Sequence, residues 1–259
     1  MQKEIEKFVE SDIMEGMPSI SAVINSIKNK NSNRRIISVY VDKSKLKSKQ
    51  KEISFLKYQS KELGFLLEFV DESVIAEHSV GNSHGGIIAF CTKKTIAPLS
   101  VEKIRKDGVY FILEGVEDPY NFGYSVRSIY ASGTDGIIVP QRNWMGAAGV
   151  VARSSAGTSE LIDMYVSDAN DAVDVFKKLG YSVICAGIRD SESIFETSLK
   201  KPLLVILGGE KRGISRDILD KADKIVRIDY GTSFNGSLST AASAAVFAFE
   251  VYRYNLINK

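Results

Sequence analysis

Short apolar runs that end at glycine or proline recur along the second half of this 259-residue chain. Residues 109–115 (VYFILEG), 136–140 (GIIVP) and 202–210 (PLLVILGGE) have the length and apolar content of buried strands. Between them lie segments of helical composition, such as 121–133 and 171–180, which end at glycine. Strands that alternate with helices predict an α/β fold with a parallel sheet and helices on both faces. The functional site is then expected at the carboxyl ends of the strands.

The remaining elements complete this pattern in both halves of the chain. The first half is expected to form a small α/β domain, with strands at 35–41, 66–70 and 86–91 and a helix at about 51–63. The second half is expected to add strands at 161–166, 181–187 and 224–231 and helices at 149–156 and 237–256. Residues 98–108 contain Pro98, several charges and few large apolar side chains, which favours a linker. We therefore predict domains over residues 1–97 and 109–259.

Composition excludes several classes of protein. Charged residues make up 25% and hydrophobic residues 44% of the chain, which is typical of globular domains and not of disordered chains. No apolar run approaches the roughly 20 residues of a membrane-spanning helix. The first ten residues are charged and lack the apolar core of a secretory signal. Two cysteines and two histidines predict neither a disulfide framework nor a metal site, so we expect a cytoplasmic protein without a structural metal.

Basic residues gather in the first half. Residues 28–61 contain 11 lysines and arginines against only Asp42 and Glu52. Such a stretch suits a polyanion, because each phosphate contact releases counterions. The alternative is a solvated, lysine-rich surface without a ligand. The candidate RNA contacts in this stretch are Arg34, Arg35, Lys43, Lys45 and Lys47.

Several familiar chemistries are absent from the sequence. No G-x-G-x-x-G follows a strand, and residues 208–215 (GGEKRGIS) lack the Lys-Ser/Thr that would complete a phosphate-binding loop. No G-x-S-x-G segment is present. A Ser/His/Asp triad would need His78 or His84, which lie far in sequence from the glycine turns.

A first unusual segment spans residues 114–127, where a strand, a polar turn and a helix follow one another. Asn121 is expected to cap the helix, and Gly123 permits close approach of another backbone. Arg127 lies one helical turn later and presents a rigid fork that suits a phosphate or carboxylate. The alternative is a surface arginine paired with Glu117 or Asp118.

Two further segments are rich in glycine and hydroxyl groups. In residues 206–215, an apolar strand is followed by Gly208, Gly209 and a Glu210 that we expect to be buried and to accept hydrogen bonds or pair with Arg127. The alternative there is a plain strand-to-helix connection. In residues 228–250, Ser237 is expected to cap an alanine-rich helix that serves either the core or a subunit interface.

Together these three segments resemble the SpoU (TrmH-type) family of RNA ribose 2′-O-methyltransferases, in the SPOUT superfamily. The first family motif, N-x-G-x-x-x-R, matches residues 121–127, and the second, G-x-E-x-x-G, matches residues 208–213. The third matches residues 237–240 (SLST), and residues 153–158 (RSSAGT) are similar to another family stretch. The chain departs from the family at Asp229-Tyr230, where Pro-Met is usual, and at Ser239, where Asn is usual. Residues 15–24 and 84–90 resemble the ends of the family's N-terminal domain.

The resemblance implies a fold, a cofactor and a reaction. The fold would be a parallel-sheet methyltransferase domain with a trefoil knot, preceded by a small α/β ribosomal-protein-like RNA-binding domain. S-adenosylmethionine would bind at Ala186, Gly187, Leu207, Gly208, Gly209, Ile228, Ser237 and Leu238. The reaction would methylate a ribose 2′-oxygen, most naturally in ribosomal RNA, without a metal. The catalytic residues would be Asn121, Arg127, Glu210, Ser237 and Ser239.

The resemblance also implies a homodimer, in which the arginine of the first motif lies near the partner's cofactor pocket. We expect Arg127 to stabilise developing negative charge and not to act as a base, because arginine stays protonated. Two alternatives remain open: a tRNA substrate, and a noncatalytic RNA-binding member of the same fold.

Overall fold

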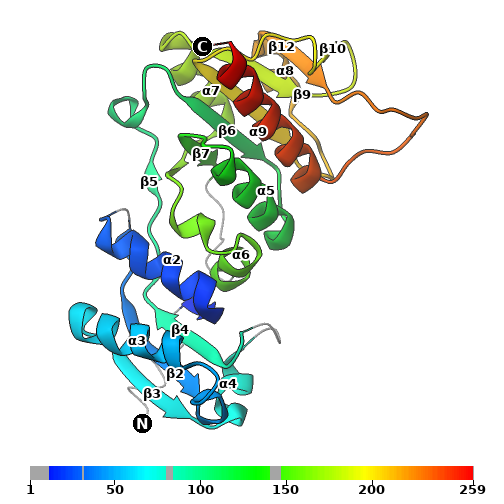
Figure 1. Ribbon diagram of the computed structural model, residues 1–259. Helices are drawn as coiled ribbons and strands as arrows, with labels where there is room; N and C mark the ends of the chain where they lie inside the picture. The colour runs from blue at the N-terminus through cyan, green and yellow to red at the C-terminus, as the bar shows by residue number, and fades with distance from the viewer. Residues whose placement is uncertain (1–11, 31, 80–83, 141–146, 259) are drawn as a thin grey trace. The chain divides into compact units, whose positions relative to one another are not determined.

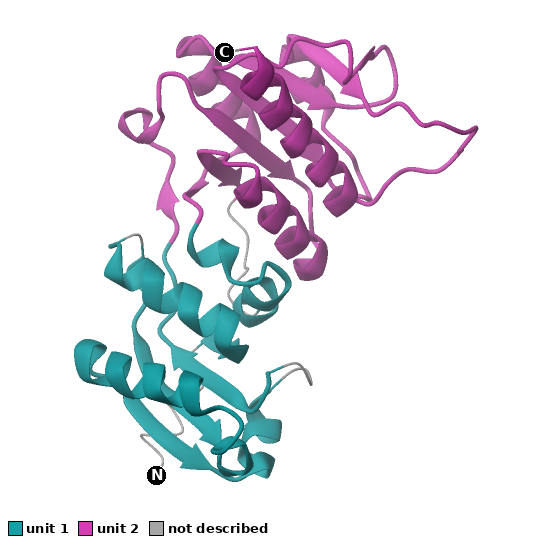
Figure 2. Cartoon of the chain, in the orientation of Figure 1, with its two compact units in different colours: residues 1–95, 143–161 teal, residues 96–142, 162–259 magenta. Residues whose placement is uncertain are grey.

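The computed structural model describes residues 12–30, 32–79, 84–140 and 147–258. The chain divides into two compact units (Figure 2). Unit 1 comprises residues 1–95 and 143–161, and unit 2 comprises residues 96–142 and 162–259.

Unit 2 is built on an eight-stranded sheet with the order β10-β12-β9-β11-β6-β7-β8-β5 (Figure 1). All of its neighbouring strands pair in parallel. Its central strands are β6 (Val109–Glu114), β7 (Gly136–Val139), β9 (Ser182–Ala186) and β11 (Leu203–Gly208). Nearer the edges lie β5 (Ala97–Pro98), β8 (Met164–Val166), β10 (Glu192–Ser193) and β12 (Lys224–Arg227). The predicted parallel α/β sheet is confirmed, whereas the trefoil knot stays a prediction.

Helices cover both faces of this sheet. On one face α5 (Pro119–Ala131) and α9 (Thr240–Ile257) pack side by side (Figure 1). On the other face α7 (Ala169–Lys178) and the short α8 (Arg216–Lys221) pack together, and Phe176 and Ile218 join the core around Tyr110. Within the described ranges, no helix is both long and apolar enough to cross a membrane.

Two helices begin at residues other than those expected. Asp118, and not Asn121, caps α5, because its carboxylate accepts a hydrogen bond from the Tyr120 amide at 3.0 Å. Proline follows at the first helical position, where the missing N–H costs nothing. Ser239, and not Ser237, caps α9 by accepting a hydrogen bond from the Ala242 amide at 3.2 Å.

Unit 1 is a four-stranded mixed sheet with the order β1-β4-β2-β3. The expected strands appear as β2 (Ile36–Asp42), β3 (Leu66–Val70) and β4 (Ile87–Cys91), and the expected helix as α3 (Gln50–Leu63). The sequence pattern missed β1 (Asp12–Glu15), α2 (Gly16–Lys28) and α4 (Glu72–His78). Its main core joins Ile20 and Ile24 of α2 to Leu56 of α3 and to Val39 and Ala89 of the sheet.

The segment between β7 and β8 leaves unit 2 and packs within unit 1. Its helix α6 (Ala148–Ser154) contacts β1 and α2. Two glycines permit the approach, since a Cβ at Gly149 would lie 2.2 Å from the Ile13 carbonyl oxygen, and one at Gly157 would lie 2.5 Å from the Ala22 Cβ. The predicted domains, residues 1–97 and 109–259 with a linker at 98–108, do not include this return of the chain to unit 1. Local sequence patterns do not reveal which distant elements a helix will pack against.

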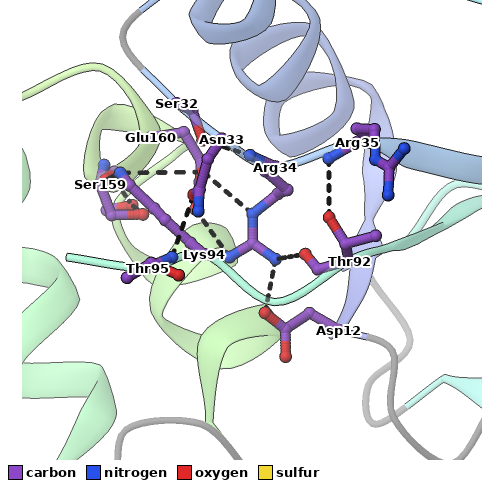
Figure 3. Close-up of polar contacts among 11 residues, drawn as sticks. Asp12, Ser32, Asn33, Arg34, Arg35, Thr92, Lys94, Thr95, Ser159 and Glu160 are labelled. Atoms are coloured by element: carbon purple, nitrogen blue, oxygen red, sulfur yellow. Dashed lines mark hydrogen bonds and ion pairs between the residues drawn. The ribbon is translucent and has the colours of Figure 1, made fainter.

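A buried arginine holds this segment to unit 1 (Figure 3). Arg34 has only 2% of its surface exposed, and its guanidinium donates to Asp12 of β1 and, at 3.2 Å, to Glu160 of the returning segment. Lys94 adds a hydrogen bond to the Ser159 carbonyl at 2.9 Å. Burial alone would lower the pKa of Arg34, but the charges of Glu160 and Asp12 outweigh it and the pKa is raised. The prediction that Arg34 binds RNA is therefore wrong, since its donors are buried and used inside the fold.

Replacing this arginine should destabilise the protein strongly. Arg34→Met leaves the buried carboxylates of Asp12 and Glu160 without their main partner, which typically costs about 3–5 kcal/mol. The matched control is Arg35→Met at the exposed neighbouring position, which should change stability by less than about 0.5 kcal/mol. Urea unfolding measures both, and equal stability of the two variants would contradict this role for Arg34.

Candidate active site

The residues expected to hold a cofactor gather at the carboxyl ends of three adjacent strands. Ala186 ends β9 and pairs with Val226 of β12, two residues before Ile228. The Gly187 amide continues the pairing with a 3.0 Å hydrogen bond to the Val226 carbonyl. On the other side of β9, β11 ends at Leu207 and Gly208. Parallel pairing therefore brings these residues to one edge of the sheet.

Glycines form a tight turn at the end of β11. The Gly209 amide donates to the Glu114 carbonyl at 2.6 Å, and the Gly213 amide donates to the Gly209 carbonyl at 3.0 Å. A Cβ at Gly209 would lie 2.0 Å from the Gly115 carbonyl oxygen, and one at Gly208 would lie 2.5 Å from the Gly213 backbone. Close contact between two backbones therefore requires both glycines.

A hydrogen bond joins the first and second sequence motifs. The Asn121 side-chain amide of α5 donates to the Glu210 carboxylate at 2.6 Å, across 89 positions of sequence. Glu210 is exposed, so the expectation that it is buried is wrong. It lies on the turn that follows β11.

The third motif approaches the same edge through the start of α9. The Thr240 hydroxyl donates to the Gly208 carbonyl at 3.3 Å. Ser237 and Ser239 are exposed and Leu238 is half-buried, at the end of the loop that projects between β12 and α9 (Figure 1). The structure does not bring these three side chains into contact with Asn121 or Glu210.

The departure from the family pattern at Asp229-Tyr230 contributes to the structure of that loop. Hydrogen bonds from Ser193 and from Arg227 lower the pKa of Asp229 and hold the start of the loop. The Tyr230 hydroxyl accepts a hydrogen bond from the Leu238 amide at 3.2 Å, and its ring contacts Phe234 with centroids 5.5 Å apart. Asp229 and Tyr230 therefore stabilise the loop, although they replace the residues that are usual in the family motif.

Arg127 stands apart from the other candidate catalytic residues. It is exposed on α5, and its guanidinium forms no ion pair in the part of the chain that the structure describes. The proposed alternative partners are engaged elsewhere, since Glu117 pairs with Lys211 at 2.9 Å and Asp118 caps the helix. The expected pairing with Glu210 is also absent. Arg127 is therefore available to a ligand or to another chain.

Comparison with known proteins identifies the family. Residues 108–249, more than half of the chain, match the model of the SpoU rRNA Methylase family. The chain belongs to this family. A 23S rRNA (guanosine-2′-O-)-methyltransferase RlmB from Shewanella oneidensis is 28% identical over 93% of this chain and 97% of its own length. A putative TrmH family tRNA/rRNA methyltransferase from Staphylococcus haemolyticus is 34% identical over 55% of this chain and 57% of its own.

Solved structures of SpoU methyltransferases share the fold. A crystal structure described as an RNA 2′-O ribose methyltransferase matches with a TM-score of 0.78 at 21% identity, over 99% of this chain and 93% of that one. An AdoMet-bound rRNA methyltransferase from Sinorhizobium meliloti matches with a TM-score of 0.75 at 19% identity, over 98% and 91%. The family assignment made from the three motifs is thus confirmed.

The SpoU motifs depend on contacts that the sequence patterns did not reveal. The backbone of Gly115 lies against Gly209, and Asp118 caps the helix that carries Asn121. The Thr240 hydroxyl at the start of α9 donates a hydrogen bond to the Gly208 carbonyl. Only Asp118 had a local signal, because an Asp-Pro pair is typical of a helix start. Cys185 lies beside the site in β9, but burial and then the Glu114 charge raise its pKa to about 12, so it is no nucleophile.

The strand edge fits the cofactor of the SpoU fold in one respect that this structure shows. Gly187 and Gly208 are half-buried and carry no side chain at the ends of β9 and β11, whereas Leu207 is buried and Gly209 is buried against the Gly115 backbone. Backbone N–H and C=O groups at strand ends suit the recognition of an adenine and a ribose.

The glycine turn supplies a test of this architecture. Gly209→Ala places a methyl group against the Gly115 backbone and should cost at least about 3 kcal/mol of stability or displace the turn. The control is Gly231→Ala, where a Cβ meets nothing within 4 Å and the effect should stay below about 0.5 kcal/mol. Thermal unfolding measures both, and a Gly209→Ala variant as stable as the control would contradict the turn geometry.

Proposed function

We propose that this protein transfers a methyl group from S-adenosylmethionine to a ribose 2′-oxygen of ribosomal RNA in the cytoplasm. The observation that carries the proposal is the hydrogen bond between Asn121 and Glu210, which joins the two most specific SpoU motifs at the carboxyl edge of the sheet. Support for ribosomal RNA comes from the relative named RlmB, because it matches both units of the chain.

The cofactor would be held by Ala186, Gly187, Leu207, Gly208, Gly209, Ile228, Ser237 and Leu238. When bound, it supplies an electrophilic methyl group on a positively charged sulfur, so the reaction needs no metal. Ser237 and Leu238 lie on the projecting loop, and we propose that this loop closes over the strand edge when the cofactor binds. Ser239 stands at the anchored end of the loop, where it caps α9 one residue before Thr240.

Arg127 is assigned to the RNA and not to the cofactor. A guanidinium carries a positive charge, so Arg127 would stabilise the negative charge that develops on the attacking ribose oxygen and position a neighbouring phosphate. Asn121 and Glu210 hold the motif loops in place around the ribose. Because Arg127 has no ion pair within the described residues, its charge is free for this use.

An Arg127→Ala variant provides the main test. Incorporation of labelled methyl groups into ribosomal RNA, or into ribosomal subunits, should fall by at least about 100-fold, while cofactor affinity measured by calorimetry stays unchanged. The control Arg216→Ala removes an exposed arginine paired only within α8 and should keep full activity. Label on a base instead of a ribose would contradict the proposed reaction.

Two outcomes would select the alternatives. Methyl transfer to tRNA and not to ribosomal RNA would show that tRNA is the substrate. The relative from Staphylococcus haemolyticus, a putative tRNA/rRNA methyltransferase, makes this a reasonable alternative. Absence of both cofactor binding and methyl transfer in the wild-type protein would favour a noncatalytic RNA-binding role.

The protein is also proposed to act as a homodimer through α5 and α9. Tyr124 of α5 and Phe249, Tyr252 and Leu256 of α9 each leave about half of their surface exposed. Exposed aromatic residues grouped on one helix pair are typical of a protein interface. In such a dimer, the free Arg127 side chain of α5 could serve the partner's cofactor site.

Charge placed on this helix pair should dissociate the dimer. A Phe249→Glu/Tyr252→Glu variant should elute as a monomer in light-scattering chromatography, because two carboxylates cannot be buried without partners. Val101→Glu, also at an exposed apolar position of unit 2, should remain dimeric. If the wild-type protein is monomeric at two concentrations that differ 100-fold, the proposed homodimer is wrong.

A further inference from the structure

A pocket of about 630 Å³ lies within unit 1, next to its buried arginine cluster, because the lining residue Thr92 accepts a hydrogen bond from Arg34 at its carbonyl. It opens where α2 and α3 end and where β2 begins. Ile27, Ile36 and Leu63, which belong to or pack against the main core of unit 1, supply an apolar lining. Ile37, whose side chain packs in a second core cluster, completes the wall with Gly64, Thr92, Arg35 and Lys93. The volume falls in the range of small-molecule sites, which are mainly apolar with a few polar groups.

Arg35 and Lys93 reach this pocket because side chains alternate in direction along an extended chain. Arg34 and Arg35 are neighbours, and the first enters the cluster with Asp12 and Glu160 while the second points away from it (Figure 3). In the same way Lys94 donates to Ser159, whereas its neighbour Lys93 lines the pocket. Successive side chains of an extended chain point to opposite sides, so each pair places one cation inside the fold and one at the pocket.

The backbone beneath Arg35 is held rigidly. Its amide donates to the Thr92 hydroxyl at 2.8 Å, and the Thr92 amide donates to the Arg35 carbonyl at 2.8 Å. Gly64 ends α3 in the left-handed conformation, and a Cβ there would meet nothing within 4 Å, so that side of the pocket is open. No carboxylate lines the pocket, and neither Arg35 nor Lys93 forms an ion pair among the residues that the structure describes.

We propose that this pocket binds a single unstacked nucleotide of the RNA substrate. Its phosphate would meet the Arg35 fork and Lys93, and its base would cover the isoleucine and leucine lining. The choice of occupant follows from charge complementarity. Arg35 and Lys93, which form no ion pair among the described residues, lie beside an apolar lining. This combination suits a ligand that has an anionic group and also a planar, apolar part. The inference rests on the proposed function, because it takes the RNA substrate as the source of that nucleotide.

The pocket is distinct from the lysines expected to bind RNA. Strand β2 runs from the pocket at Ile36 to Asp42, after which Lys43, Lys45 and Lys47 follow. Seven residues of strand span about 20 Å, so the two sites lie at opposite ends of the small sheet. A single strand of RNA bound at both ends would cross unit 1 along β2.

Methyl NMR of the full chain, labelled at isoleucine and leucine methyl groups, tests the binding directly. The ligands are guanosine monophosphate, guanosine and inorganic phosphate, added separately. The methyl resonances of Ile27, Ile36 and Leu63 should shift with the nucleotide, and Ile112 of unit 2 should not. Shifts with phosphate alone as large as those with the nucleotide would reduce the site to an anion site and overturn the proposal, as would the absence of any shift.

Three variants distinguish the bidentate geometry of the Arg35 guanidinium from the effect of its charge alone. Arg35→Met and Arg35→Lys should each weaken nucleotide binding, the first by about tenfold, because a bidentate contact needs the guanidinium. Lys51→Met removes an exposed cation at the opposite end of α3 and should leave the isoleucine shifts unchanged. Equal loss in Arg35→Met and Lys51→Met would show a general charge effect and contradict a specific pocket.

Methyl transfer by the same variants separates this inference from the proposed function. Arg35→Met should raise the KM for RNA and leave kcat and cofactor affinity unchanged. A wild-type enzyme that methylates RNA without isoleucine shifts would refute the pocket alone. Isoleucine shifts in a protein that transfers no methyl group would refute the proposed reaction and leave the pocket as a nucleotide site.

Discussion

The close backbone contact between Gly209 and Gly115 is the constraint on which the candidate site depends. These glycines follow β11 and β6, which pair in parallel from Leu203↔Val109 to Gly208↔Glu114. Parallel pairing alone would bring the two strand ends to one edge, but side chains would hold the following turns apart. With no Cβ at Gly209, the turn folds onto the Glu114 carbonyl, and Glu210 reaches Asn121. The glycines of the second SpoU motif thus serve folding first and ligand access second.

Charge is used differently in the two units. In unit 1 a buried guanidinium is surrounded by carboxylates, and the cluster fixes a segment whose flanks belong to the other unit. Desolvation offsets much of the attraction in a buried ion pair, but removal of one partner leaves an uncompensated buried charge, so Arg34 and its carboxylates depend on one another. In unit 2, Arg127 is left exposed and without an ion pair among the described residues, although carboxylates lie nearby in sequence at Glu117 and Asp118. A guanidinium without an ion pair can form bidentate hydrogen bonds to a phosphate without first losing a partner.

The departures from the family motifs have local physical explanations. Asp229 is held by Ser193 and Arg227, and Tyr230 packs on Phe234 and accepts from the Leu238 amide. Ser239 serves as the cap of α9, a role that its hydroxyl fulfils well. These contacts give the loop between β12 and α9 its own internal support, so the departures are compatible with a loop that folds over a ligand.

The sequence by itself determined most of the strands, the parallel sheet of unit 2 and the three motifs, because these depend on local periodicity and on residues close together in the chain. It also determined the family. Only the tertiary structure decided which side chains are free to act. Arg34 and Arg35 look alike in sequence, yet the carboxylates that bury Arg34 lie 22 and 126 positions away. The return of residues 143–161 to unit 1 likewise depends on contacts of Gly149 and Gly157 with distant backbone and side chains. Burial and pairing are properties of long-range neighbours, and no local pattern encodes them.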